Sequence, residues 1–145
     1  MRILAIDYGR KRIGLAISDP LGITAQPLAP IVEDSPEKVL RHLEKIVKEI
    51  EVEEVVVGLP LQLDGTEGLA AKEVKRFAET LSKTISVPVH LIDERLTTAL
   101  ANTLLSHAGQ RLKKRKERLD TVAAQTILQT YLQTKQSSSE KEAHE

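Results

Sequence analysis

The chain has 145 residues, of which 41% are hydrophobic and 29% are charged, a composition typical of one globular domain with a single buried core. It contains no cysteine, which excludes disulfides, thiolate nucleophiles and cysteine-ligated zinc. The formal net charge is zero, yet basic side chains cluster at residues 10–12 and 110–118, so one face of this neutral chain can still bind a polyanion.

The first predicted elements are strands. Residues 2–7 and 13–18 are short apolar stretches, and the loop between them is too short for a helical crossover, so the two strands are expected to pair antiparallel. Residues 23–32 suggest a third strand, and the two prolines within it favour a position at the edge of the sheet.

A helix is expected to follow the third strand. Ser35 and Pro36 are typical of the N-cap and the first helical position. Apolar residues then recur with the helical period and predict one buried face: Val39, Leu40, Leu43, Ile46, Val47 and Ile50.

The middle of the chain predicts a strand, a helix and another strand. Residues 54–57 form an apolar stretch that is expected to stop at Gly58-Leu59-Pro60, and Asp64-Gly65 marks a turn. Residues 87–92 predict the last strand, which ends at Asp93-Glu94. The helix between the two strands has an apolar face that consists of Ala70, Val74, Phe77, Ala78 and Leu81.

Helical patterns resume at residues 98–106 and 118–132, whereas residues 135–145, with three consecutive serines and mixed charge, predict a disordered tail. This order of elements predicts an α/β fold with a five-stranded mixed sheet, an antiparallel hairpin at its start and helices on its flanks. We expect one domain over residues 1–134.

Three carboxylates are candidates for a shared site. Asp7 ends the first predicted strand, Glu94 follows the last one, and Asp120 lies in the first turn of the final predicted helix. Sites in open α/β sheets form at the carboxyl ends of the parallel strands. Three carboxylates that converge there would repel one another unless a cation lay between them, and hard oxygen ligands of this kind suit Mg²⁺ or Mn²⁺.

Each of these acids also has a simpler interpretation. Asp7 precedes a glycine and could be a turn residue. Asp120 could interact only with the helix dipole, and Glu94 could form a surface ion pair with Arg95. The basic cluster at residues 110–118 could be a solvated charge run without a partner. Spacing alone does not choose between these interpretations.

Four sequence blocks resemble the bacterial YqgF (RuvX-type) family, and the resemblance covers nearly the whole chain, from Met1 to about Leu132. The blocks occur in the family's order and spacing: Asp7-Tyr8-Gly9 with Arg12-Ile13-Gly14-Leu15-Ala16 and Ser18-Asp19; Gly58-Leu59-Pro60 with Asp64-Gly65-Thr66; Asp93-Glu94-Arg95-Leu96-Thr97-Thr98; and Asp120-Thr121-Val122-Ala123-Ala124.

The resemblance implies a ribonuclease H-like fold and a catalytic, metal-binding triad of Asp7, Glu94 and Asp120. Basic residues are expected to bind the phosphates of a nucleic acid: Arg10, Lys11, Arg12, Arg111, Lys113, Lys114, Arg115, Lys116 and Arg118. A further group is expected to contact substrate or to support the site: Gly9, Gly58, Pro60, Arg95, Thr97 and Thr98. Gln62 is a departure, because many relatives have Asn there.

The implied function is hydrolysis of phosphodiester bonds by two metal ions, with Mg²⁺ or Mn²⁺ as cofactor. The family includes nucleases that mature the 5′ end of 16S rRNA and proteins like Holliday junction resolvases, so the substrate is pre-rRNA, in ribosome biogenesis, or branched DNA. Aromatic residues are only 2% of the chain, which leaves little surface for stacking unpaired bases and favours recognition of backbone charge and shape.

Partners and location follow from the same reasoning. We expect nucleic acid and ribosomal precursor particles as partners, and a monomer or weak homodimer. No apolar run approaches the ~20 residues that a membrane helix needs, and a signal-peptide pattern is lacking, so we expect a cytoplasmic protein without a membrane partner.

Two rival functions remain open. The domain could bind nucleic acid without cutting it. It could also belong to actin-like or sugar-kinase ATPases, which begin with a strand ending in Asp-x-Gly but normally need two such domains. Saturable micromolar ATP binding would favour that second rival.

Overall fold

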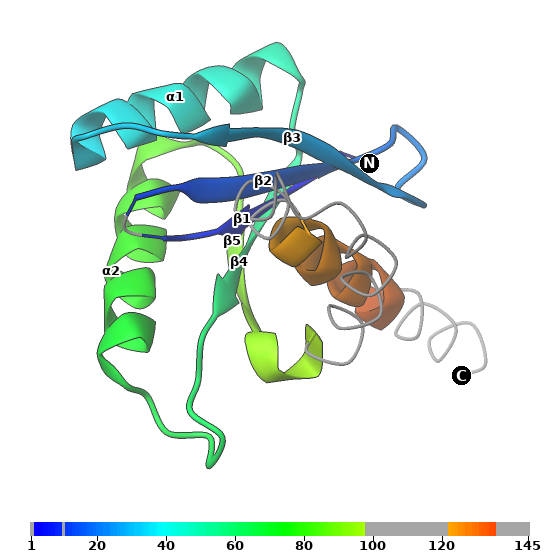
Figure 1. Ribbon diagram of the computed structural model, residues 1–145. Helices are drawn as coiled ribbons and strands as arrows, with labels where there is room; N and C mark the ends of the chain where they lie inside the picture. The colour runs from blue at the N-terminus through cyan, green and yellow to red at the C-terminus, as the bar shows by residue number, and fades with distance from the viewer. Residues whose placement is uncertain (1, 10, 98–121, 136–145) are drawn as a thin grey trace, which may run out of the picture.

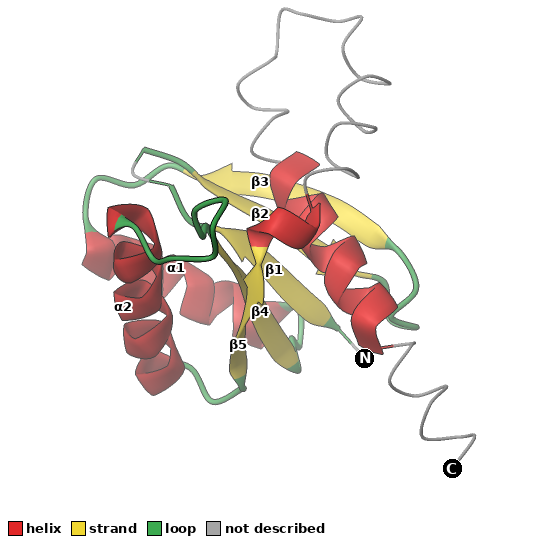
Figure 2. Ribbon diagram, turned by 90° about the horizontal axis from the view of Figure 1, so that it is seen from below, coloured by secondary structure: helices red, strands yellow, loops and turns green. Residues whose placement is uncertain are grey.

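The computed structural model describes residues 2–9, 11–97 and 122–135, which form one mixed sheet with helices on both faces (Figures 1 and 2). The elements in chain order are β1 (Ile3–Asp7), β2 (Ile13–Ser18), β3 (Ala25–Ile31), α1 (Pro36–Glu49), β4 (Glu54–Leu59), α2 (Leu69–Thr84), β5 (Val89–Asp93), the short 3-10 helix η1 (Glu94–Thr97) and a helix over residues 122–135.

The strand order in the sheet is β3-β2-β1-β4-β5. β1 pairs antiparallel with β2 and parallel with β4, and β4 pairs parallel with β5. The predicted five-stranded mixed sheet with an antiparallel hairpin is therefore confirmed. β3 lies at one edge, as Pro27 and Pro30 suggested, because an edge strand loses no sheet hydrogen bond to a residue that lacks an N–H.

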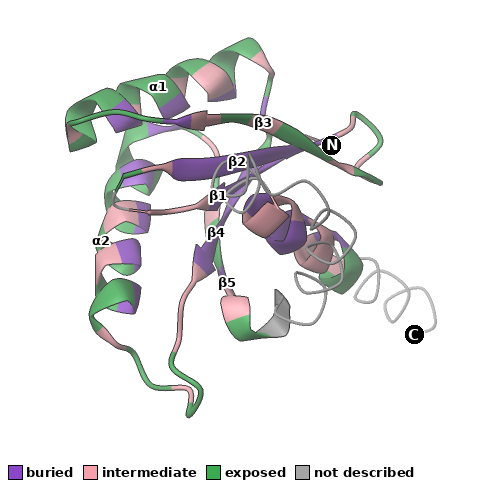
Figure 3. Ribbon diagram, viewed as in Figure 1, coloured by how far each residue is buried: buried purple, intermediate pink, exposed green. Residues whose placement is uncertain are grey.

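Alternating side chains divide the core into two layers. On β1, Leu4 and Ile6 face the layer under α1 and α2, whereas Ile3 and Ala5 face the helix over residues 122–135. Figure 3 shows the buried residues concentrated in the sheet and on the inner faces of these helices. The two faces matter for the site, because neighbouring residues at the end of a strand point to opposite layers.

The start of α1 follows the predicted signals. The Ser35 side chain caps α1 by accepting a hydrogen bond from the backbone N–H of Lys38 at 3.3 Å, and Pro36 begins the helix.

The helical pattern at residues 98–106 and the predicted tail fall outside the described residues, except that residue 135 belongs to the last helix. No helix in the described ranges is long and apolar enough to cross a membrane.

The end of β4 differs from the prediction. The sequence pattern was expected to stop this strand at Gly58, but the strand continues to Leu59 because Gly58 and Leu59 pair with Ile92 and Asp93 of β5. Glycine weakens a strand because it loses more backbone entropy and has no side chain to pack, and parallel pairing with the next strand outweighs that loss here. β4 therefore reaches the same edge of the sheet as Asp7.

A buried acid fixes the last helix to the sheet. Glu54 is only 6% exposed, and its carboxylate accepts hydrogen bonds from the Tyr131 hydroxyl and, at 2.6 Å, from the Lys135 ammonium. His90 Nε2 lies 3.5 Å from the same carboxylate. Glu54 begins β4, whereas Asp7 ends β1, so this network anchors the helix at the end of the sheet that lies away from Asp7.

Replacing Glu54 by alanine is expected to lower the free energy of unfolding by roughly 2–4 kcal/mol, because Tyr131 and Lys135 would lose a buried charged acceptor. Denaturant unfolding measures this loss. Glu53→Ala, at an exposed neighbouring position, is the matched control and should change stability by less than about 0.5 kcal/mol. Equal effects of the two substitutions would show that the Glu54 network contributes nothing to the free energy of unfolding.

Candidate active site

Asp7 and Gly58 lie on adjacent strands at the same edge of the sheet. Ile6 of β1 is the partner of Val57 in β4, so the next residues along the two parallel strands are Asp7 and Gly58. Ile6 packs into the layer under α1 and α2, and the alternation of side chains places Asp7 on the opposite face, toward the helix over residues 122–135.

Glu94 lies over Gly58. A Cβ atom built at Gly58 would lie 2.5 Å from Glu94 Oε1, 2.9 Å from Glu94 Cγ and 2.6 Å from Ile127 Cδ1. The space that any other side chain would fill is therefore occupied by the Glu94 carboxylate and by Ile127. Because β4 lies between β1 and β5, this gap allows Glu94, at the end of β5, to reach across β4 toward Asp7.

The electrostatics of Glu94 confirm that the two acids are close. Burial, which is the largest cause, together with the negative charge of Asp7, a side-chain hydrogen bond with Asp7 and the charge of Asp93, raises the pKa of Glu94 to about 7. A carboxyl with an ordinary pKa would be ionised well below neutral pH. The structure thus brings together two of the three predicted acids.

Arg95 contacts Asp93 and not Glu94. Its Nη2 lies 2.7 Å from Asp93 Oδ2, and its Nε lies 2.9 Å from the same oxygen. These hydrogen bonds lower the pKa of Asp93. The alternative interpretation of Glu94, a surface ion pair with Arg95, is therefore wrong, because Arg95 pairs with Asp93 and Glu94 is half-buried beside Asp7.

Arg95 also ties the loop after β4 to this edge. Its Nη1 donates to the Leu63 carbonyl at 3.3 Å, next to a turn at Gly65 whose φ of 88° favours glycine. Within that loop the Gln62 side-chain oxygen accepts a hydrogen bond from the Thr66 hydroxyl at 3.0 Å. The amide of Gln62 thus supports the loop itself, which is a sufficient reason for its presence. Pro60 begins the same loop, directly after β4.

The β1–β2 hairpin contributes Gly9, Lys11 and Arg12. A Cβ at Gly9 would lie 2.5 Å from the Arg12 carbonyl oxygen, so only glycine allows this tight connection. Lys11 is exposed, as a phosphate contact requires, whereas Arg12 is half-buried.

Much of the predicted site falls outside the described residues: Asp120, Thr98, Arg10, Arg111, Lys113, Lys114, Arg115, Lys116 and Arg118. Thr97 ends η1. Within the described ranges no cluster of three or more His, Asp or Glu side chains could hold a metal ion. The described part of the site therefore supplies two carboxylates, and the third ligand stays a prediction.

The pKa of Glu94 predicts how stability depends on pH. A carboxyl whose pKa is raised from 4.5 to about 7 on folding stabilises the fold fully below pH 4.5, and this stabilisation is lost as the pH rises through about 7. From about pH 5.5 to about pH 8.5 the metal-free protein should lose roughly 1–2 kcal/mol of unfolding free energy, a value reduced for solvent screening of the half-buried side chain.

Thermal or denaturant unfolding at the two pH values measures this change. The Glu94→Gln variant cannot ionise and should show a flatter pH profile over the same range. Addition of Mg²⁺ should raise the stability of the wild-type protein more at the higher pH, since the cation competes with the proton. An unchanged profile in Glu94→Gln would contradict the raised pKa.

Comparison with known proteins gives both a family and a fold. A family model described as "RuvX: Holliday junction resolvase" matches residues 1–134. Relatives from Koribacter versatilis and Clostridium acetobutylicum, each named "Putative pre-16S rRNA nuclease", are 43% and 45% identical over 132 residues. These alignments cover 91% of this chain and 86% and 98% of the two relatives.

Solved structures of resolvases are among those that the chain resembles. RuvC of T. thermophilus in complex with a Holliday junction substrate has a TM-score of 0.59 at 16% identity, over 92% of this chain and 96% of that one. The fowlpox virus resolvase bound to Holliday junction DNA has a TM-score of 0.54 at 14% identity, over 92% and 98%. At such identities the likeness shows the fold, which is ribonuclease H-like, and the match of the family model over residues 1–134 shows that the chain belongs to the RuvX family.

Proposed function

We propose that this chain is a nuclease that hydrolyses phosphodiester bonds in structured nucleic acid, and that its substrate is the 5′ end of pre-16S rRNA during ribosome biogenesis in the cytoplasm. The observation that carries the nuclease proposal is the approach of Glu94 to Asp7 across Gly58 at the carboxyl end of parallel strands. The rRNA substrate is supported by the name of the relatives at 43–45% identity.

The two carboxylates fit a divalent cation. Half-buried acids that share one place repel each other when ionised, and a cation between them removes that repulsion. We propose that Asp7, Glu94 and Asp120 hold Mg²⁺ or Mn²⁺, whose all-oxygen preference they match. When bound, a pair of such ions activates water and stabilises the leaving oxygen of an in-line displacement.

Other residues position the substrate in this proposal. Lys11 projects from the β1–β2 hairpin, directly after the strand that carries Asp7, and is exposed for contact with a backbone phosphate. The basic residues at 111–118 would add phosphate contacts. Binding through backbone charge should weaken steeply as salt increases.

The test compares two substrates with the purified full-length chain: an RNA with the precursor 5′ end of 16S rRNA, and a four-way DNA junction. In Mg²⁺ or Mn²⁺ we expect cleavage of the RNA at a defined 5′ position, slower or absent cleavage of the junction, and no cleavage of either with a chelator. Metal-dependent binding of both substrates without cleavage of either would contradict a nuclease and favour a binding module.

A Holliday junction resolvase is the second candidate, and the description of the matching family model favours it. A resolvase that cuts two strands symmetrically needs a two-fold dimer, whereas an RNA end needs only one active site. We propose a monomer or weak homodimer. Sedimentation of the chain alone and with each substrate measures the oligomeric state and so distinguishes the two candidate functions. A stable dimer on the junction, together with paired cuts in the cleavage assay, would contradict the rRNA proposal and favour a resolvase.

A further inference from the structure

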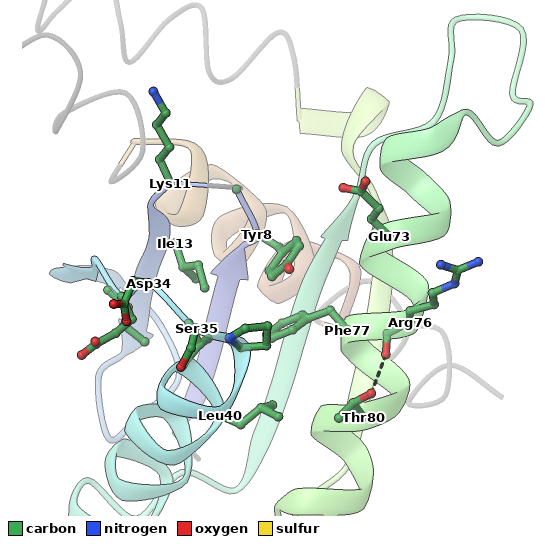
Figure 4. A pocket seen from close by; sticks show the side chains of 15 residues that line it. Tyr8, Lys11, Ile13, Asp34, Ser35, Leu40, Glu73, Arg76, Phe77 and Thr80 are labelled. Atoms are coloured by element: carbon green, nitrogen blue, oxygen red, sulfur yellow. Dashed lines mark hydrogen bonds between the residues drawn. The ribbon is translucent and has the colours of Figure 1, made fainter.

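A cavity of about 340 Å³ opens beside Asp7 on the other face of the sheet, between the β1–β2 hairpin, α1 and α2 (Figure 4). Tyr8 follows Asp7 and packs with the layer under α1 and α2, so the cavity and the carboxylate pair lie on opposite faces of the same sheet edge. The lining that matters here consists of Tyr8, Phe77, Lys11, Arg76, Asp34 and Glu73.

Two aromatic rings form one wall of this cavity. Tyr8 and Phe77 stack with their ring centroids 4.3 Å apart and their planes 22° apart, and both side chains are only half-buried. The chain has two tyrosines, one phenylalanine and no tryptophan. Few as these rings are, two of the three meet at one cavity next to Asp7.

The rim carries groups that match the rest of a nucleotide. Lys11 and Arg76 are exposed cations that can pair with backbone phosphates. Asp34 Oδ1 accepts a hydrogen bond from Lys38 at 3.1 Å, and a carboxylate has further lone pairs, so Asp34 and Glu73 can also accept hydrogen bonds from the amino groups of cytosine, adenine or guanine. A nucleotide combines a flat base with a phosphate, so it matches both the aromatic wall and the exposed cations.

We infer that this cavity receives one unpaired nucleobase of the substrate strand, adjacent to the nucleotide whose phosphate lies at Asp7. The inference rests on the proposed nuclease function. Asp7 and Tyr8 are adjacent in the chain and face opposite sides of the sheet, so a nucleic-acid strand that bends around this end of the sheet can place one nucleotide at the carboxylates and its neighbour in the cavity. Unpaired bases of RNA are commonly recognised by stacking on aromatic side chains. The enzyme would thus select cleavage sites next to an unpaired nucleotide.

Phe77 is the only phenylalanine, so incorporation of fluorine-labelled phenylalanine places one reporter in the cavity. The labelled full-length Glu94→Gln variant is titrated in Mg²⁺ with a short single-stranded RNA and with the same strand made abasic at one central position. We expect the fluorine resonance to shift with the intact strand and to shift much less with the abasic strand. Equal shifts, or none with either strand, would overturn the inference.

This reporter needs no cleavage, so it separates the inference from the proposed function. In cleavage assays with the unlabelled enzyme, Phe77→Leu should raise KM about 5- to 100-fold for a substrate with an unpaired base beside the scissile bond. The same variant should leave KM unchanged for a substrate that is abasic at that position, and Phe77→Tyr should restore the wild-type KM. An equal rise in KM on both substrates would mean that Phe77 only supports the fold, and would overturn the inference.

Discussion

The Asp7→Asn variant is expected to cleave nucleic acid at least about a thousandfold more slowly than the wild-type chain while it keeps its fold. Asp7 ends β1 beside Gly58, and its charge acts directly on Glu94. An amide has nearly the same shape as the carboxylate but lacks the negative charge that a divalent cation needs. Single-turnover cleavage rates in Mg²⁺ measure the effect.

The substitution should not reduce stability, because it removes a repulsion. Without the charge of Asp7, the pKa of Glu94 should fall toward its ordinary value, and the protein at about pH 8 should be as stable as the wild type or more stable. Glu49→Gln, at an exposed position near the end of α1, is the matched control and should change neither rate nor stability. Undiminished cleavage by Asp7→Asn would mean a contaminating nuclease or a site elsewhere.

The Gly58→Ala variant is expected to lose about a hundredfold in cleavage rate, although the change adds one methyl group. The new Cβ would lie 2.5 Å from Glu94 Oε1 and 2.6 Å from Ile127 Cδ1, so both side chains must move. A displacement of about 1 Å in a catalytic group can cost a hundredfold in rate. Overpacking should lower the unfolding free energy by only about 1–3 kcal/mol, so the variant should still fold.

One measurement and one control variant separate a displaced Glu94 from a general loss of structure. The pKa of Glu94, followed by NMR, should fall in Gly58→Ala, because the side chain leaves the neighbourhood of Asp7. Gly68→Ala is the matched control, since its φ of −83° suits alanine and its Cβ would meet only the flexible Gln62 side chain, at 2.9 Å. Full activity in Gly58→Ala with an unchanged Glu94 pKa would show that the glycine is not needed for the site.

The fold could be predicted from the sequence where one local signal decided each element. The short connection after Asp7 allowed only a hairpin, and Ser35 with Pro36 marked the start of α1. Gly58 was expected to end its strand, because glycine usually signals a turn. Its pairing with Ile92 depends on the register of two strands about thirty residues apart, which no local pattern contains.

The site was predicted only in part, for the same reason. Residue type and position at strand ends identified Asp7 and Glu94. The partner of Arg95 depends on how η1 leaves β5, and the sequence could not distinguish Asp93 from Glu94 in that role. The stacking of Tyr8 on Phe77 requires that the end of β1 and the middle of α2 face one another. The helical spacing of apolar residues indicated only that Phe77 lies on the buried face of its helix.

A crystal structure of the full-length chain grown with Mn²⁺ would test the central claim most directly, because the anomalous signal of the metal locates it independently of the protein atoms. We predict a peak between the carboxylates of Asp7 and Glu94, over the space that Gly58 leaves, and no such peak in crystals of Asp7→Asn. Mn²⁺ bound elsewhere, with the two carboxylates still hydrogen-bonded to each other, would contradict the account.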